Sequence, residues 1–200
     1  MMTEQSNPSH FFAYMARMKL INRWPLMRNT QLENVQEHSL QVAMIAHALA
    51  IVRNEYFDGD LDAERIATLA IFHDASEVLT GDLPNPVKYF NAEIAKEYKK
   101  IEKVAEEKLV GLLPERLQKY YQPLVCSEHH NKEEYKIVKA ADILSAYFKT
   151  IEELNAGNHE FSRAQQRLKE TLAELNMPEI EFFLNLFEPG FSLSLDAITE

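Results

Sequence analysis

Apolar residues recur at helical spacing along most of this chain, and this periodicity constrains the fold more than any other feature. The 200 residues include only 5 glycines, and no shift in composition divides the chain. Long runs with apolar residues three or four positions apart are typical of helices that bury one face. We therefore predict an all-α fold in which residues 1–200 form a single helical-bundle domain, with its core at about 10–188.

The same periodicity places the individual helices. We predict helices at residues 10–21, 34–54, 61–81, 91–113, 114–125, 133–154, 159–175 and 178–187. Asn34 and Glu37 have the spacing of a capping box, which places His38 in the first turn of the second helix. That helix is apolar on two sides, so we expect it at the centre of the bundle. Its second apolar line consists of Leu40, Met44, His47 and Ile51.

Charge and composition exclude several classes of protein. Lys and Arg number 21 against 31 Asp and Glu, which gives a net charge of −10. A chain this acidic repels a nucleic-acid backbone, so we expect no nucleic-acid polymer as a partner. No apolar run approaches the roughly 18 residues of a membrane span, and residues 1–10 lack the features of a signal peptide. Cys126 is the one cysteine, so no internal disulfide can form, and we expect a cytoplasmic protein.

Polar residues interrupt the apolar pattern of the helix predicted at 61–81. His73, Asp74 and Glu77 fall among residues that are otherwise apolar. A buried His-Asp pair is costly to desolvate unless something pairs with it, and a divalent metal ion is one such partner. Gly81 can end this helix as a left-handed C-cap, and we expect a short rigid loop over residues 82–86.

Four residues on three apolar helices are candidate metal ligands: His38, His73, Asp74 and Asp142. Three helices of a bundle can converge and supply two imidazoles and two carboxylates. Two alternatives stay open at this point. The four side chains can form a buried hydrogen-bond network without a metal, and Asp142 alone can cap a neighbouring helix.

These residues also resemble a known family. His38, the contiguous pair His73-Asp74 and the distant Asp142 resemble the H…HD…D signature of the HD-domain metal-dependent phosphohydrolases. Three further stretches, at residues 23–25, 73–84 and 86–90, resemble the bacterial HD-domain 5′-deoxynucleotidases of the YfbR type. The similarity runs from about residue 9 to near the end of the chain. It implies an HD-domain bundle, a homodimer, and hydrolysis of deoxyribonucleoside 5′-monophosphates in preference to ribonucleotides.

The resemblance implies one divalent ion per subunit, held by the four candidate ligands. Nitrogen and oxygen ligands without sulfur suit Co, Mn or another transition metal, and ligand type does not choose among them. We expect Glu77 to orient or deprotonate the attacking water. Asp82, just beyond the helix end, can share or take that role, and the sequence does not separate the two carboxylates.

The remaining expectations concern the substrate. Arg23 suits a phosphate clamp, because guanidinium binds phosphate bidentately and keeps its charge. Trp24 is either a core anchor or a wall of the nucleoside pocket, and the resemblance favours a wall that faces the sugar C2′ and disfavours a 2′-hydroxyl. In the family a threonine often stands at the position of Asn85, so we expect an altered contact there. The implied substrate-contacting residues are Arg23, Trp24, His38, Asp74, Asp82, Leu83, Pro84, Asn85 and Asp142.

Other interpretations of the sequence remain. We expect His129 and His130 to be solvated and the metal site to be mononuclear. Another HD-type hydrolase, acting on nucleoside triphosphates or cyclic nucleotides, is the first alternative. A non-catalytic nucleotide-binding or scaffold protein is the second, although a scaffold has no need of polar groups on its core faces.

Overall fold

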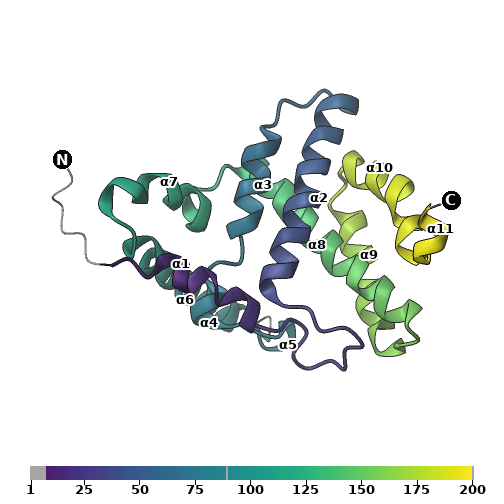
Figure 1. Cartoon of the computed structure of the whole chain (residues 1–200), viewed down its shortest axis with the longest axis horizontal. Helices are drawn as coiled ribbons and strands as arrows, with labels where there is room; N and C mark the ends of the chain where they lie inside the picture. The colour runs from purple at the N-terminus through teal and green to yellow at the C-terminus, as the bar shows by residue number, and fades with distance from the viewer. Residues whose placement is uncertain (1–7, 89, 200) are drawn as a thin grey trace. The chain divides into compact units, whose positions relative to one another are not determined.

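A computed structural model describes residues 8–88 and 90–199 (Figure 1). The regular elements in this part of the chain are helices, and its only β-type pairing is an isolated bridge between Asn22 and Asn34. The predicted all-α fold is therefore confirmed. Contacts divide the described residues into two compact units: unit 1 holds those of 1–26, 33–37 and 72–130, and unit 2 holds those of 27–32, 38–71 and 131–200. No helix among the described residues is both long and apolar enough to span a membrane.

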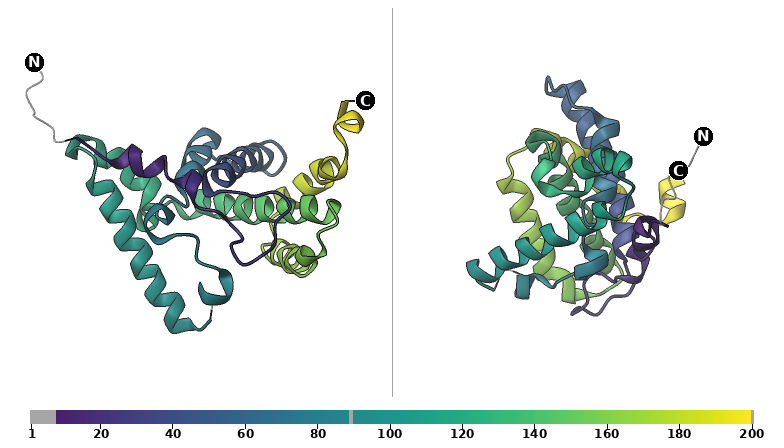
Figure 2. Two further views of the ribbon diagram at one scale, coloured as in Figure 1. Left: turned by 60° about the horizontal axis from the view of Figure 1, so that its bottom comes forward. Right: turned by 90° about the vertical axis from the view of Figure 1, so that its left-hand side faces the viewer.

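Unit 1 is built around a long helix, α6. Its elements are α1 (Phe11–Met15), η1 (Met18–Leu20), α4 (Glu77–Thr80), α5 (Asn85–Lys88), α6 (Ala92–Gly111), α7 (Glu115–Val125) and η2 (Ser127–His129). Helices α1, α4, α5 and α7 all contact α6, which is the long teal helix that runs diagonally in the left view of Figure 2. Phe11 and Leu109 are fully buried in the core, and the Phe11 ring lies 5.1 Å from that of Tyr121. Val78 and Leu79 of α4 pack against this small core.

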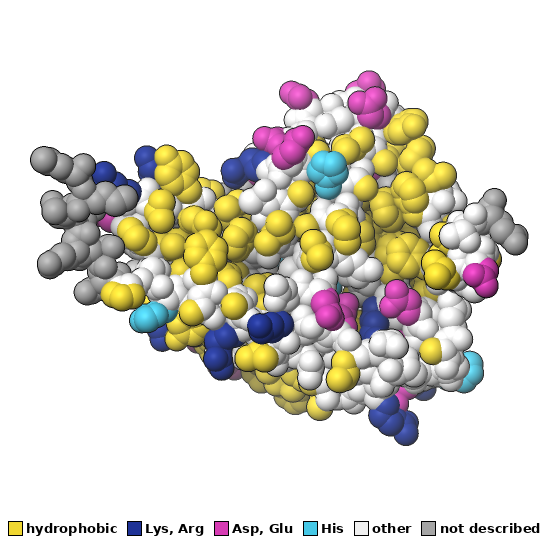
Figure 3. Space-filling model, in the orientation of Figure 1, with side chains coloured by type: hydrophobic (Ala, Val, Ile, Leu, Met, Phe, Trp, Pro, Cys, Tyr) yellow, Lys and Arg dark blue, Asp and Glu magenta, His cyan; other side chains and the backbone are white. Residues whose placement is uncertain are grey.

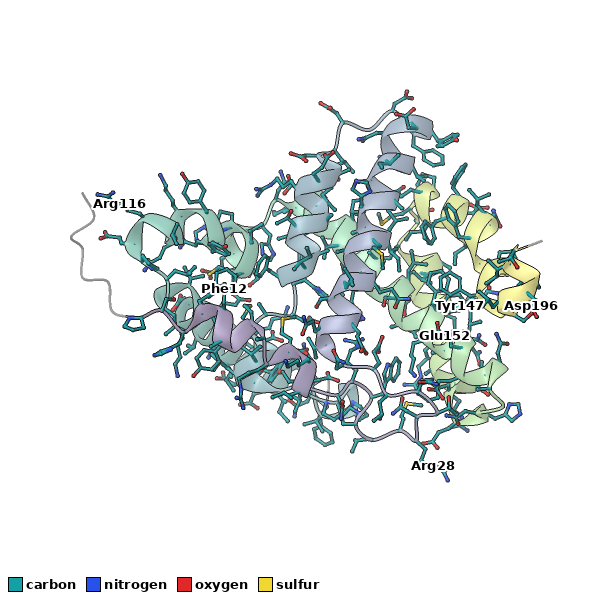
Figure 4. All side chains as sticks on the ribbon, in the orientation of Figure 1. Phe12, Arg28, Arg116, Tyr147, Glu152 and Asp196 are labelled. Carbon is teal, nitrogen blue, oxygen red and sulfur yellow. The ribbon has the colours of Figure 1, made fainter. Side chains whose placement is uncertain are left out.

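Unit 2 holds the larger core. Its elements are most of α2 (Val35–Tyr56), nearly all of α3 (Ala63–Phe72), α8 (Lys132–Asn155), η3 (His159–Phe161), α9 (Ser162–Glu174), α10 (Pro178–Phe187), η4 (Glu188–Ser192) and α11 (Leu195–Thr199). Helices α8 and α9 pack along each other, and α2 and α3 bury apolar faces in the same core as α8. Two polar contacts fasten its edges. Tyr147 donates a hydrogen bond to Glu188 at 2.8 Å, and Arg28 binds Glu160 at 2.7 Å; Tyr147 and Arg28 are labelled in Figure 4.

The start of α2 forms as the sequence predicts. Asn34 Oδ1 accepts hydrogen bonds from the backbone N–H of Gln36 and Glu37 at 3.1 and 3.0 Å, and Glu37 accepts one from the backbone of Asn34 at 3.4 Å. This is the predicted capping box, and it fixes His38 in the first turn. The capping of helix ends therefore positions one candidate ligand directly.

The expectation that α2 is buried on two sides is wrong. Val42, Leu49 and their neighbours on one line are buried, whereas Leu40, Met44 and Ile51 on the other are 58, 60 and 43% exposed. The packed elements of unit 2 cover only one face of this helix. Hydrophobic side chains consequently gather at the surface along α2 and α10, as Figure 3 shows.

Two predicted helices are interrupted. The helix predicted at 10–21 is split into α1 and η1, because Arg17 and Leu20 bond three residues back, to Tyr14 and Arg17, at 2.8 Å each. The helix predicted at 61–81 ends at Phe72 and resumes as α4. Between them the chain also bonds three residues back, with Ala75 N–H to Phe72 O and Glu77 N–H to Asp74 O at 3.0 Å. The His-Asp pair therefore lies on a tight turn and not within a helix.

Gly81 ends α4 as predicted, but it does not have the expected left-handed helical conformation, and the loop after it is shorter than predicted. Gly81 has φ +74° and ψ 165°, a conformation that is essentially restricted to glycine. The irregular segment then ends at Pro84, since α5 begins at Asn85, where residues up to 86 were expected to be loop. Tyr89, part of the 86–90 stretch, lies outside the described residues.

Candidate active site

His38 and Asp142 form a pair within unit 2. His38 is completely buried near the start of α2, and Asp142 is half-buried on α8. His38 Nε2 lies 3.1 Å from Asp142 Oδ1. The other carboxylate oxygen, Oδ2, lies 2.6 Å from Nζ of Lys139, one turn earlier on the same helix. Two candidate ligands are thus adjacent, and each is held by a regular helix.

The hydrogen bonds around His38 place its ring proton. The Ser145 hydroxyl donates to Gln41 Oε1 at 2.8 Å, and its oxygen lies 3.1 Å from His38 Nδ1. With the hydroxyl proton directed to Gln41, Ser145 can accept from Nδ1–H, and in that tautomer the lone pair of Nε2 faces Asp142 Oδ1. Two acceptors at this distance repel unless a second proton or a cation lies between them. The pair therefore fits a cation site, with Ser145 and Gln41 holding the ring in the orientation that a ligand needs.

His73 and Asp74 lie in unit 1, on the turn between α3 and α4. His73 Nε2 is 3.1 Å from Asp74 Oδ2, and the same oxygen is 3.6 Å from Nη1 of Arg23. All three side chains are mostly withdrawn from water. The Asp74 carboxylate therefore lies beside both the His73 imidazole, which can bind a metal, and the Arg23 guanidinium, which carries a positive charge.

Glu77 begins α4, directly after this turn. Its Oε2 atom is buried and accepts no hydrogen bond from any described residue. Burial, with the Asp74 and Asp82 carboxylates nearby, raises the pKa of Glu77 to about 10, although Arg23 and Lys88 act in the opposite direction. At that pKa the side chain is a neutral acid at neutral pH, and a cation bound nearby would lower the pKa and favour the carboxylate that can bind a water.

The loop after α4 carries the other predicted substrate residues. Asp82, Leu83 and Pro84 are half-buried, and the side chain of Asn85 lies outside the described part of the structure. Tyr98 on α6 supports the start of this loop, because its hydroxyl lies 3.4 Å from both Thr80 Oγ1 and Gly81 O. The loop therefore rests on a rigid helix, but its contacts with a substrate remain a prediction.

Arg23 and Trp24 share one partner, Glu33. Glu33 Oε2 accepts a hydrogen bond from Arg23 Nε at 3.1 Å and one from Trp24 Nε1 at 3.2 Å. Trp24 is half-buried with φ +57°, a rare conformation for a bulky residue. Trp24 is therefore not a buried core anchor, although its predicted place in a nucleoside pocket is not tested by these contacts.

Sequence reasoning missed three residues of the site. The sequence pattern singles out none of Gln41, Ser145 and Glu33 as a site residue. Glu33 reaches Arg23 because residues 21–23 pair with residues 33–35, and no periodicity predicts that pairing. His129 is exposed as expected, whereas His130 is half-buried, so the expectation that both are exposed is wrong for His130.

The sequence of this chain is similar to those of known 5′-deoxynucleotidases. A family model described as 5′-deoxynucleotidase YfbR-like matches residues 10–191. A 5′-deoxynucleotidase of Vibrio vulnificus is 61% identical over 96% of this chain and 98% of its own length.

Two solved structures share the fold. An HD-domain phosphohydrolase of Listeria innocua is 24% identical, with a TM-score of 0.80 over 91% of this chain and 88% of that one. The HD phosphohydrolase DatZ of cyanophage S-2L, solved with dA and one catalytic Zn²⁺ ion, is 19% identical, with a TM-score of 0.58 over 90% of this chain and 95% of that one. At these identities the two structures support the fold alone.

Proposed function

The chain belongs to the YfbR-like 5′-deoxynucleotidase family, and we propose from that premise which of its residues carry out the reaction. Its activity is that of a 5′-deoxynucleotidase, an HD-type hydrolase, as in relatives of about 60% identity that cover 96% of the chain. The alternatives of a scaffold protein and of a hydrolase for triphosphates or cyclic nucleotides are set aside by this similarity. The substrate is a deoxyribonucleoside 5′-monophosphate, and the products are a deoxynucleoside and phosphate.

We propose that His38, His73, Asp74 and Asp142 hold one divalent transition-metal ion per subunit. The support comes from donor chemistry: His38, His73 and Asp74 are a group that could hold an ion, and His38 and Asp142 face one another as two acceptors. DatZ, which shares the fold, was solved with a single zinc ion. When bound, such an ion supplies a Lewis acid for the phosphoryl group and lowers the pKa of water. Its identity stays open between Co, Mn and other transition metals.

Glu77 is the proposed group that orients the attacking water and takes its proton. A bound metal ion would lower the raised pKa of this buried carboxyl, so that the carboxylate could take the proton, and its Oε2 has no other hydrogen-bond partner among the described residues. Asp82 contributes one of the nearby negative charges and is the second candidate for proton handling. Water is the nucleophile, so no covalent phosphoenzyme is needed.

Arg23 is proposed to bind the phosphate of the substrate, and Trp24 is proposed to contact its sugar. Glu33 engages Nε of Arg23, and a guanidinium can bind phosphate through its terminal nitrogens. The Trp24 ring is proposed to pack against C2′, so that a ribose hydroxyl would be buried without a partner. An unsatisfied hydroxyl costs about 1–3 kcal/mol, enough for substantial discrimination. Leu83, Pro84 and Asn85 are proposed to form the opposite rim.

One experiment tests these roles together. Phosphate release is measured from paired deoxyribo- and ribonucleoside monophosphates, with metal-free protein and with several divalent ions added. We expect turnover of the deoxy series, dependence on an added ion, and loss of turnover in Asp142→Ala. Equal rates on both sugars would refute the role of Trp24, while turnover by metal-free protein would refute the metal site.

We also propose that residues 1–200 form one domain, with its core at about 10–188, and that the protein is a homodimer. A single family model matches residues 10–191 without interruption, which supports one domain. The exposed apolar line of α2 (Leu40, Met44 and Ile51) suits contact with a second copy. Light scattering of the wild type and of Met44→Glu tests this, with a dimer expected for the first and a monomer for the second. A cytoplasmic location is proposed as well, where the free buried Cys126 stays reduced.

A further inference from the structure

Glu33 occupies a fixed position beside two proposed substrate residues. Arg23 N–H donates to Glu33 O at 2.9 Å, Val35 N–H donates to Ile21 O at 3.0 Å, and Asn22 and Asn34 pair between them. This short antiparallel pairing sets the register of the two segments. The Glu33 side chain therefore meets Arg23 and Trp24 because the backbone brings it there.

A single carboxylate oxygen holds both side chains. Oε2 of Glu33 accepts from Arg23 Nε at 3.1 Å and from Trp24 Nε1 at 3.2 Å. The side chains of Arg23 and Glu33 are only 13 and 12% exposed, so this pair is sheltered from water and from salt. Binding through Nε restrains the plane of the guanidinium, and its Nη1 lies 3.6 Å from Asp74 Oδ2.

Trp24 needs an external restraint. Its φ of +57° is a conformation that bulky residues adopt only where surrounding contacts hold them. The indole N–H is a donor only, and Glu33 supplies its acceptor. The bond to Glu33 is one contact that holds the indole in this conformation.

We propose that Glu33 is a positioning residue that sets the Arg23 guanidinium and the Trp24 indole together, and so couples phosphate binding to sugar selection. The inference rests on the substrate roles proposed above for Arg23 and Trp24. A merely structural Glu33 would change stability and leave the ratio of deoxy to ribo turnover unchanged. A positioning Glu33 changes that ratio and the KM in protein that is still folded.

The test uses Glu33→Gln, which keeps the shape and removes the charge. We expect KM for deoxynucleoside monophosphates to rise and the deoxy-to-ribo ratio of kcat/KM to fall about tenfold. Because Trp24 is the only tryptophan, its fluorescence and its quenching by acrylamide report the indole directly, and we expect both to change. Glu33→Asp retracts the carboxylate but keeps its charge, and it serves as the second variant should Glu33→Gln not fold.

Glu160→Gln is the matched control, since it breaks another carboxylate contact with an arginine Nε, that of Arg28, at 2.7 Å. Its ratio and fluorescence should equal those of the wild type. A wild-type ratio in folded Glu33→Gln and Glu33→Asp would overturn the proposal.

A double variant separates failure of this inference from failure of the substrate roles. If Trp24→Phe alone leaves the ratio unchanged, the role proposed for Trp24 is wrong. If Trp24→Phe lowers the ratio and Glu33→Gln/Trp24→Phe lowers it no further, Glu33 acts through Trp24 as proposed. Additive losses in the double variant would contradict coupling through the indole.

Discussion

Glu77 in unit 1 and Glu153 in unit 2 are the same residue type in opposite surroundings. Glu153 accepts hydrogen bonds from the backbone of Thr30 and Gln31 and from the side chains of Thr30, Lys149 and Asn158. Burial by itself would raise the pKa of Glu153, but the bonds from Lys149, Asn158 and Thr30 outweigh it and lower the pKa to about 2. Glu77 has a buried oxygen with no such donor, and its pKa is raised to about 10.

The difference teaches how to tell a structural carboxylate from a reactive one. Donors that saturate Glu153 keep it charged and fasten the segment at residues 27–32 to α8 and to the turn after it. Their absence around Glu77 keeps that carboxyl protonated at neutral pH and leaves its Oε2 without a donor among the described residues, in a region where a substrate or ion can supply the missing partner. Substitution of each glutamate should therefore separate activity from stability.

The largest expected effect is on the activity of Glu77→Gln. We expect kcat on a deoxynucleoside monophosphate to fall about 10²–10⁴-fold, the usual contribution of a general base. The thermal midpoint of metal-free protein should not fall, because the neutral amide avoids the desolvation that penalises the carboxylate. Steady-state kinetics and calorimetry measure the two quantities. Wild-type kcat would make Asp82 the better candidate.

The converse substitution, Glu153→Gln, should act on stability. It leaves the Lys149 ammonium buried without its counter-charge, so we expect the free energy of unfolding to drop by about 3–5 kcal/mol. The kcat of the folded fraction should be unchanged, because Glu153 contacts no proposed catalytic residue. Urea denaturation measures the loss, and Glu181→Gln, an exposed position on α10, is the matched control. A loss of kcat in Glu153→Gln without a loss of stability would contradict the assignment of Glu153 as a structural carboxylate.

The pH dependence of stability should follow Glu153. Its pKa is depressed in the folded state, so its contribution is complete above the ordinary value of about 4.5 and is lost as pH falls toward 2. The full contribution is on the order of 3 kcal/mol. Urea denaturation of the wild type and Glu153→Gln between pH 6 and pH 3 should give curves that converge as pH falls. If the stability of wild type and of Glu153→Gln changed in parallel with pH, the hydrogen bonds to Glu153 would not be lowering its pKa.

The smallest effect is expected for Thr30→Val. It removes one donor to Glu153, the hydroxyl bond of 2.7 Å, and leaves the backbone bonds in place. We expect a loss of about 1 kcal/mol in unfolding free energy and no change in kcat. Chemical denaturation resolves a difference of this size when wild type and variant are measured side by side. No change at all would mean that the backbone N–H groups saturate Glu153 by themselves.

Periodicity and capping chemistry predicted most of the fold. They located α2, α6, α7, α8 and α10 to within a few residues, and the capping box put His38 in its observed turn. They failed where hydrogen bonding changes from four residues back to three, as at His73–Ser76, because the side-chain pattern is compatible with both. They also failed to show that one apolar line of α2 is exposed, since periodicity reports a face but not what covers it.

The sequence predicts those residues of the site whose chemical type is itself unusual at their positions. His73-Asp74, His38 and Asp142 are recognisable because polar groups on apolar faces need partners. Glu33 and Gln41 were not, because their roles arise from tertiary contacts with residues 10 and 104 positions away along the chain. Residues that position the site are thus the part that only three-dimensional packing shows.

The break between α3 and α4 limits how far this enzyme can be made more robust. Substitutions at Ala75 or Ser76 that favour a continuous rod would add local stability, as helix-promoting changes commonly do. They would also convert residues 73–76 from three residues per turn to the 3.6 of an α-helix. Over the four residues from His73 to Glu77, this change rotates the Glu77 side chain by about 80° around the helix axis. We therefore expect heat-tolerant variants of this protein to gain their stability from substitutions elsewhere and to keep the break between α3 and α4.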